Sequence, residues 1–201
     1  MNDVVMLTVA SVALAVVFAG LELVVRRASV GSEGTRRIAH VAACAYSVWI
    51  HSFLSTGQFI AVAGSFVALM AGSKLLHVLR SIHGTRRRTW GEVYMPLGLL
   101  VGAAIAGGNT GAFVAAAVIL GVADVAAGLV GDARGSESKT WWGTAAFAFV
   151  AIVVLIALGR GVLLGVVLGV ALALVERVSP WGTDNVTIPV AAAAAIVALE
   201  A

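Results

Sequence analysis

Three acidic residues lie within or at the ends of long apolar stretches of this chain. Asp124 interrupts the stretch that starts at Gly111, and Glu22 and Glu176 lie near the ends of two others. A charged side chain inside a bilayer is costly, so such residues usually face a polar cavity or a partner. Carboxylates in this position can bind a divalent metal or accept a proton. The structural alternative is that each forms an ion pair with a nearby arginine.

Basic side chains accompany these acids in four polar segments, at residues 26–37, 80–92, 131–141 and 176–185. An arginine side chain can bind phosphate through two parallel hydrogen bonds. Mg²⁺ is usually held by one or two carboxylates together with phosphate oxygens. Phosphoryl transfer needs mainly positioning and charge neutralisation. The combination is typical of a site for a nucleoside triphosphate and a metal, although basic segments also attract anionic lipids.

The composition favours a membrane protein, because 61% of the 201 residues are hydrophobic and only 11% are charged. A helix of about 20 apolar residues crosses the hydrocarbon layer. The apolar stretches lack the alternation of barrel strands and exceed the roughly 10 residues that such strands need. We therefore expect an all-α fold, a polytopic transmembrane bundle of about eight helices in a single domain over residues 1–201.

The expected helices cover residues 4–25, 38–54, 59–79, 93–107, 111–130, 142–158, 161–175 and 186–199. Each of the four polar segments joins an odd helix to the next even one, so all four share one membrane face. Of the 13 lysines and arginines, only Arg160 falls on the other face. The positive-inside rule makes the basic face cytoplasmic and places both termini outside.

Several other function classes find no support in the sequence. Cys44 is the single cysteine, so it forms no disulfide within the chain and indicates no zinc site. The net charge of +3 reflects membrane topology, and we expect no nucleic-acid partner. The chain also lacks the glycine-rich phosphate loops of soluble nucleotide-binding proteins and the sequence motifs of protein kinases.

Four motifs follow one another at the expected cytoplasmic helix ends. They are TRRIAH at 35–40, RRTWGEVYMPLG at 87–98, ADVAAGLVG at 123–131 with KTWWGT at 139–144, and GTDNVTIP at 182–189. In these motifs the chain resembles the polyprenol kinase family, which includes dolichol kinases, phytol and farnesol kinases and CTP-dependent diacylglycerol kinases. The resemblance extends from about Arg36 to Pro189, nearly the whole chain after the first expected helix.

The resemblance implies transfer of the terminal phosphate of a nucleoside triphosphate, often CTP, to the hydroxyl of a membrane lipid. The size of the chain is close to that of the compact prokaryotic members, so we expect a prokaryotic plasma membrane with a cytoplasmic active face. Phytol, geranylgeraniol, a longer polyprenol and diacylglycerol all fit as acceptors. Trp142 replaces a family glutamate and Thr140 a serine, which leaves the choice between CTP and ATP open.

The resemblance and the residue chemistry together suggest roles. We expect Asp124 and Asp184 to bind Mg²⁺ or orient the lipid hydroxyl, and Asp124, His40 and Glu92 to be catalytic. His40 equally suits a helix-packing histidine bonded to a carbonyl, and Glu92 a helix cap three residues after Thr89. The residues expected to bind the nucleotide are Arg36, Arg37, Arg88, Gly131, Gly135, Lys139, Thr140 and Asn185.

Two further functions stay open at this point. A CTP-dependent lipid nucleotidyltransferase would also use a nucleotide at a membrane face, and its product would be a pyrophosphate-linked nucleotide lipid. A small ion-coupled transporter would use Asp124 as a relay near the middle of the membrane. Charges confined to one face argue against the transporter.

Overall fold

The computed structural model describes residues 3–28, 31–76, 89–135 and 138–200, and these residues form helices and turns without any strand. The helices are α1 (Asp3–Ala28), α2 (Ser32–His51), α3 (Thr56–Leu75), α5 (Gly91–Ala106), α6 (Thr110–Val118), α7 (Asp124–Ala133), α8 (Trp141–Ala157), α9 (Val162–Val178) and α10 (Asp184–Glu200). A π-helical turn, η1 (Ile119–Ala123), joins α6 to α7 in one continuous rod. The expected all-α fold is therefore confirmed, with eight helical rods in the described residues.

The ends of several helices differ from the sequence expectation, and those of α2 and α9 bear on the site. Helix α2 begins at Ser32, so Arg36 and Arg37 lie in its first turns and not in a loop. Glu33 lies three residues before Arg36, and their side chains pair at 3.0 Å. Helix α9 likewise continues to Val178. Hydropathy marks only the apolar part of a helix, whereas these polar turns are stabilised by pairing along the helix surface.

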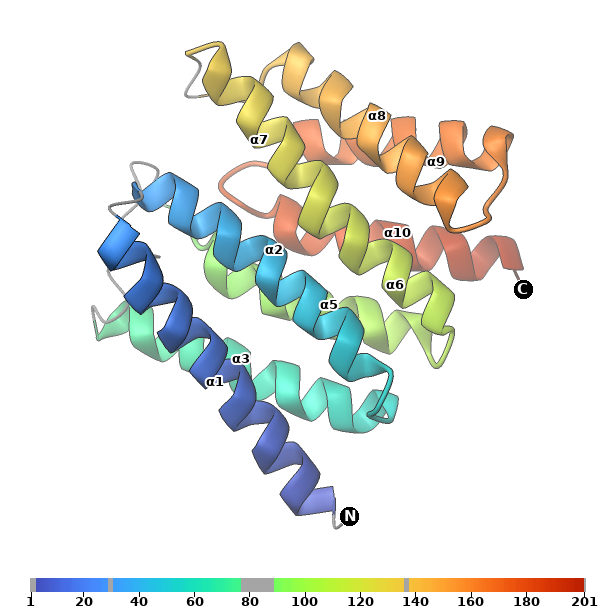
Figure 1. Ribbon diagram of the computed structural model, residues 1–201. Helices are drawn as coiled ribbons and strands as arrows, with labels where there is room; N and C mark the ends of the chain where they lie inside the picture. The colour runs from blue at the N-terminus through green and yellow to red at the C-terminus, as the bar shows by residue number, and fades with distance from the viewer. Residues whose placement is uncertain (1–2, 29–30, 77–88, 136–137, 201) are drawn as a thin grey trace.

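The helices run alternately up and down, so the helix ends that flank the polar segments gather at one end of the bundle (Figure 1). The last turns of α1, α3, α7 and α9 and the first turns of α2, α5, α8 and α10 lie at this end. At the opposite end, the side chain of Arg160 pairs with Glu200, and the amide of Asn109 donates to Glu200 at 2.7 Å. The described helix turns beside the polar segments thus share one end, and Arg160 lies at the other, as the alternation predicts.

Helix α10 packs closely against α5 through small residues and a proline. A Cβ atom on Gly98 would lie 2.0 Å from the backbone carbonyl oxygen of Asn185 and 2.9 Å from Pro189. Pro189 has no N–H, so the carbonyl of Asn185 lacks the usual donor four residues later in the helix. Only glycine lets α5 approach this part of α10 so closely. The contact fixes the start of α10, and with it Asp184 and Asn185, against α5.

Two helical segments, Thr56–Leu75 and Thr110–Ala133, are long and apolar enough to cross a membrane. Helices α5 and α8 are similarly apolar but shorter. Many large apolar side chains point outward from the bundle, among them Val16, Phe149 and Leu163, which are 63%, 69% and 80% exposed. Soluble proteins seldom expose apolar surface on this scale. The single cysteine, Cys44, is buried and free, as expected for a core residue.

Candidate active site

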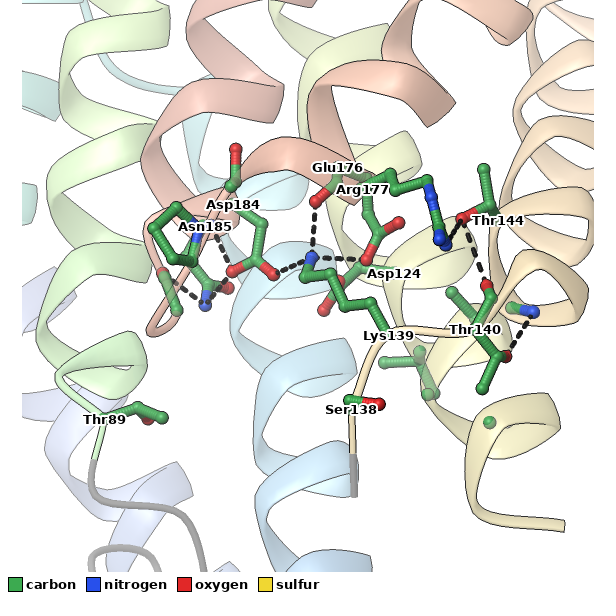
Figure 2. Close-up of a pocket in the computed structure, with 18 of the residues that line it drawn as sticks. Thr89, Asp124, Ser138, Lys139, Thr140, Thr144, Glu176, Arg177, Asp184 and Asn185 are labelled. Carbon is green, nitrogen blue, oxygen red and sulfur yellow. Dashed lines mark hydrogen bonds and ion pairs between the residues drawn. The ribbon is translucent and has the colours of Figure 1, made fainter. Parts of the chain in front are cut away.

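A polar cavity of about 650 Å³ opens at the end of the bundle where the polar connections meet. Its walls come from α2, α7, α8, α9 and the turn before α10 (Figure 2). Four cationic side chains line it, namely Arg36, Arg37, Lys139 and Arg177. The acidic side chains in its wall are Glu33, Asp124, Asp132, Glu176 and Asp184. Four helices, α2, α7, α9 and α10, and the loop before α8 thus bring opposite charges to one place.

The π-helical turn η1 immediately precedes Asp124 and sets its direction. Such a turn inserts one residue into an α-helix and is frequent at functional sites. The ring nitrogen Nε2 of His40 lies 3.1 Å from the carbonyl oxygen of Leu120, which is part of this turn. The same nitrogen lies 3.9 Å from Oδ2 of Asp124. His40 therefore ties α2 to the irregular turn and stands beside the carboxylate that follows it.

Three carboxylates converge at the base of the cavity (Figure 2). Asp124 comes from the start of α7, Glu176 from the last turns of α9, and Asp184 from the first turn of α10. One oxygen of each lies within 4.8 Å of the others. Glu176 and Asp184 are buried, and Asp124 is partly exposed toward the cavity. Three negative charges at this separation repel one another strongly unless cations lie among them.

Lys139 supplies one of these cations. Its Nζ lies 2.7 Å from Oδ2 of Asp184 and also bonds the carboxylate of Glu176, while the backbone carbonyl of Glu176 accepts at 2.5 Å. Burial alone would lower the pKa of Lys139, but the charge and hydrogen bond of Asp184 and those of Glu176 outweigh it and raise the pKa. Lys139 therefore carries its positive charge throughout the neutral pH range.

The donor set fits a hard divalent cation such as Mg²⁺. One lysine balances only one of the three carboxylate charges, so the cluster retains a net negative charge. Oδ1 of Asn185 is buried and has no hydrogen-bond partner within the described residues. Its Nδ2 bonds the carbonyl of Gly182 at 3.2 Å, which leaves the oxygen as the free end of the amide. Carboxylate and amide oxygens are the ligands that Mg²⁺ and Ca²⁺ take in proteins.

The arginines around the cavity are already held in place by neighbours. Arg37 pairs with Asp132 of α7, and Arg36 pairs with Glu33 on its own helix. Arg177 lies 3.6 Å above the ring of Trp141. These contacts orient the guanidinium groups before any ligand arrives, which reduces the entropy lost on binding an anion.

The turn from α9 to α10 is held in an unusual backbone conformation. Trp181 has φ +51° and Gly182 has φ +83°, both in the left-handed region. A Cβ atom on Gly182 would lie 2.9 Å from the backbone of Gly91, so glycine is needed for contact as well as conformation. For the bulky Trp181 the conformation is costly. Such strain persists where surrounding structure imposes it, often beside a functional site.

Most of the residues singled out in the sequence line the cavity. They are Arg36, Arg37, His40, Asp124, Gly131, Lys139, Thr140, Asp184 and Asn185. Glu92 lies instead on a smaller adjoining pocket, where its carboxylate is 2.5 Å from Nζ of Lys74. Gly135 follows α7 with φ +68° and is not part of the cavity wall. Arg88 lies outside the described residues.

The sequence indicates Glu176 only as a general candidate for a polar cavity or a partner, and it assigns no site role to Arg177 or Thr144; all three line the cavity. Glu176 was visible only as an acid at the end of an apolar helix. Its role as the second partner of Lys139 depends on how α9 meets the loop before α8. Its position at the end of an apolar helix is the signal that marks it in the sequence.

One comparison with known proteins identifies a relative. The chain is 31% identical over 191 residues to a phytol kinase of Synechocystis sp., and the alignment covers 86% of this chain and 82% of that protein. No family profile matches the chain. No solved structure matches it significantly.

The fold and the cavity define a helical bundle with a cation-lined acidic site at one end. Its similarity to the Synechocystis protein extends over most of both chains. The chain therefore belongs to the phytol kinase family of prenol kinase-like proteins.

Proposed function

We propose that this protein is a membrane lipid kinase. It transfers the terminal phosphate of a nucleoside triphosphate, with CTP the favoured donor, to the hydroxyl of a prenyl alcohol such as phytol, geranylgeraniol or a longer polyprenol. The observation that carries the proposal is the cluster of Asp124, Glu176 and Asp184 around Lys139, inside a cavity lined by three arginines. Phosphoryl transfer requires this combination of metal ligands and phosphate-binding cations.

The helices would cross a bilayer with the cavity at the cytoplasmic surface. Two helices of sufficient length and apolarity, together with the exposed apolar side chains, support this arrangement. The gathering of basic residues at the cavity end agrees with the positive-inside rule. A lipid hydroxyl and a soluble nucleotide can meet at such a boundary.

The acidic cluster would hold Mg²⁺ through Glu176, Asp184 and one oxygen of Asp124, with Oδ1 of Asn185 as a neutral ligand. When bound, the ion neutralises charge on the phosphate oxygens. Arg36, Arg37 and Arg177 bind the triphosphate, and the backbone beside Gly131 and Thr140 lies close to it. Lys139 stabilises the negative charge that builds up on the transferred phosphoryl group.

The chain's own groups can account for the proton as well. The alcohol oxygen forms a bond to the terminal phosphorus, and the bond from that phosphorus to the bridging oxygen breaks, which releases the nucleoside diphosphate. The hydroxyl proton passes to the second oxygen of Asp124. His40, 3.9 Å from this carboxylate and bonded to Leu120, orients it. A positioned base of this kind contributes roughly 10²–10⁴-fold to a rate.

The test is transfer of γ-labelled CTP or ATP, with Mg²⁺, to a panel of lipid alcohols by the purified protein. Label is expected in one lipid, to be lost in Asp124→Asn, and to persist in the control Glu200→Gln at the opposite end of the bundle. The absence of transfer from either nucleotide to any alcohol would refute the proposal. Label from α-labelled CTP appearing in the lipid would instead identify a nucleotidyltransferase.

A further inference from the structure

The charged cavity is suited to a nucleotide but not to the hydrocarbon chain of an acceptor lipid. Its lining includes Arg36, Arg37, Asp124, Lys139 and Glu176. An alkyl chain placed there would remove these groups from water without offering hydrogen bonds, which is strongly unfavourable. The chain of the acceptor must therefore lie elsewhere, with only its hydroxyl group reaching the acidic cluster.

A second, apolar pocket lies between α1, α2, α3 and α5. Apart from Tyr46 and Ser47 its lining is apolar, and Tyr46 turns its hydroxyl away to the carbonyl of Ala10 at 2.8 Å. The apolar lining residues are Leu14, Ala43, Ile50, Phe59, Val62, Ala63, Phe66, Met95, Pro96 and Leu99. This lining suits a branched hydrocarbon chain.

A third pocket connects the other two through shared walls. It has Arg36, His40 and Asn185 in common with the charged cavity, and Met95 in common with the apolar pocket. Glu92 and Met70 complete its lining together with Ala39 and Gly91. The third pocket thus lies between the nucleotide cavity and the apolar pocket, and the side chain of Met95, 4% exposed, separates it from the apolar pocket.

We propose that the hydrocarbon chain of the acceptor alcohol binds in the apolar pocket beneath α1, and that its hydroxyl passes Met95 to reach His40 and Asn185. This inference rests on the proposed kinase function and adds the acceptor's binding site to it. Ala43 and Ala63 determine how long a hydrocarbon chain fits, because their small side chains leave the space that the far end of the chain fills. Met95 determines how far the chain can advance toward the nucleotide.

Helix α1 moves outward to admit the hydrocarbon chain of the acceptor alcohol. The apolar pocket has room for about 20 Å³, little more than one water molecule. α1 packs on α2 and α3 at the outer edge of the bundle and diverges from its neighbours (Figure 1). Its opposite side carries exposed Val5, Val9 and Val12, which favour contact with lipid. A helix with lipid on one side and a narrow pocket on the other can shift without exposing polar groups.

The test is Ala63→Leu, which fills the apolar pocket without touching the charged cavity. We expect the KM for phytol to rise by about tenfold or more, because a few methylene groups discriminate on this scale in an apolar pocket. The kcat with a short alcohol such as geraniol should stay unchanged. The matched control is Ala61→Leu, the same substitution on an exposed position of α3.

The outcomes separate this inference from the kinase function itself. Suppose that the wild type transfers phosphate and that KM depends on the length of the alcohol in the same way in Ala63→Leu and Ala61→Leu. That result would overturn the acceptor site and leave the kinase function intact. Absence of transfer by the wild type would overturn the kinase. If Ala63→Leu fails to fold, Met95→Ala provides the opposite test. It should lower the KM for bulkier alcohols, and an unchanged KM would refute the route.

Discussion

Nζ of Lys139 lies 2.7 Å from Oδ2 of Asp184, although 45 residues separate them in the sequence. The same nitrogen bonds Glu176 in the neighbouring helix. Lys139 thus links the loop before α8 to the end of α9 and the start of α10. It partly neutralises a cluster that would otherwise hold three mutually repelling carboxylates.

Lys139→Met is expected to make the protein more dependent on divalent metal. Without the ammonium group, the repulsion among Asp124, Glu176 and Asp184 is relieved only by a bound cation. The variant should have a lower Tm than the wild type in chelator and a larger rise in Tm on addition of Mg²⁺. Phosphate transfer should fall on the order of 10³-fold, because a charge that stabilises the transferring group is lost.

The control for Lys139 is Lys74→Met, since Lys74 lies at the same end of the bundle and pairs with Glu92 outside the cavity wall. Its Mg²⁺-induced change in Tm should match that of the wild type. If Mg²⁺ raised the Tm of Lys139→Met and of the wild type by the same amount, the acidic cluster would not be the metal site.

Gly98→Ala is expected to destabilise the fold and disturb the site together. The new Cβ would lie 2.0 Å from the carbonyl oxygen of Asn185, so α5 and α10 must separate. Overpacking of this kind costs about 1–3 kcal/mol. Because Asp184 and Asn185 begin α10, we expect a lower Tm and reduced transfer, measured by thermal unfolding in detergent and by the labelled-phosphate assay.

The matched control is Gly72→Ala in α3, where nothing lies within 4 Å of the added Cβ. A helical alanine there should stabilise the protein by about 0.5–1 kcal/mol relative to glycine. If Gly98→Ala behaved like Gly72→Ala, the close contact between α5 and α10 would be disproved.

His40→Gln is expected to retain transfer within about tenfold of the wild type, whereas His40→Ala should lose on the order of 10²-fold. The glutamine amide nitrogen reaches about as far as imidazole Nε2 and can donate to the carbonyl of Leu120. If His40 were the group that takes the hydroxyl proton, glutamine and alanine would be equally inactive. The kcat of both variants, measured over a range of pH, distinguishes a positioning role from proton transfer.

Hydropathy predicted the helices well and their polar ends poorly. Long uncharged stretches identify each of the eight helical rods of the described residues, because long apolar runs without alternation favour helices over strands. Hydropathy does not predict the start of α2 at Ser32, because the first turns of this helix are polar. The motif residues of the cavity follow mainly from the resemblance to a family, and the sequence marks Glu176 as a candidate acid without a specific role.

The sequence by itself determined which helices form and that their polar ends share one end of the bundle, because length, apolarity and alternation are local properties of the chain. The tertiary structure alone decided which polar residues meet. Asp124, Glu176 and Asp184 converge because a π-helical turn directs the first, and because Gly98 and Pro189 bring α10 against α5. Likewise, only the packing of α1, α2, α3 and α5 forms the apolar pocket, which a smaller pocket separates from the charged cavity. Such contacts depend on how distant helices pack, and no local pattern encodes them.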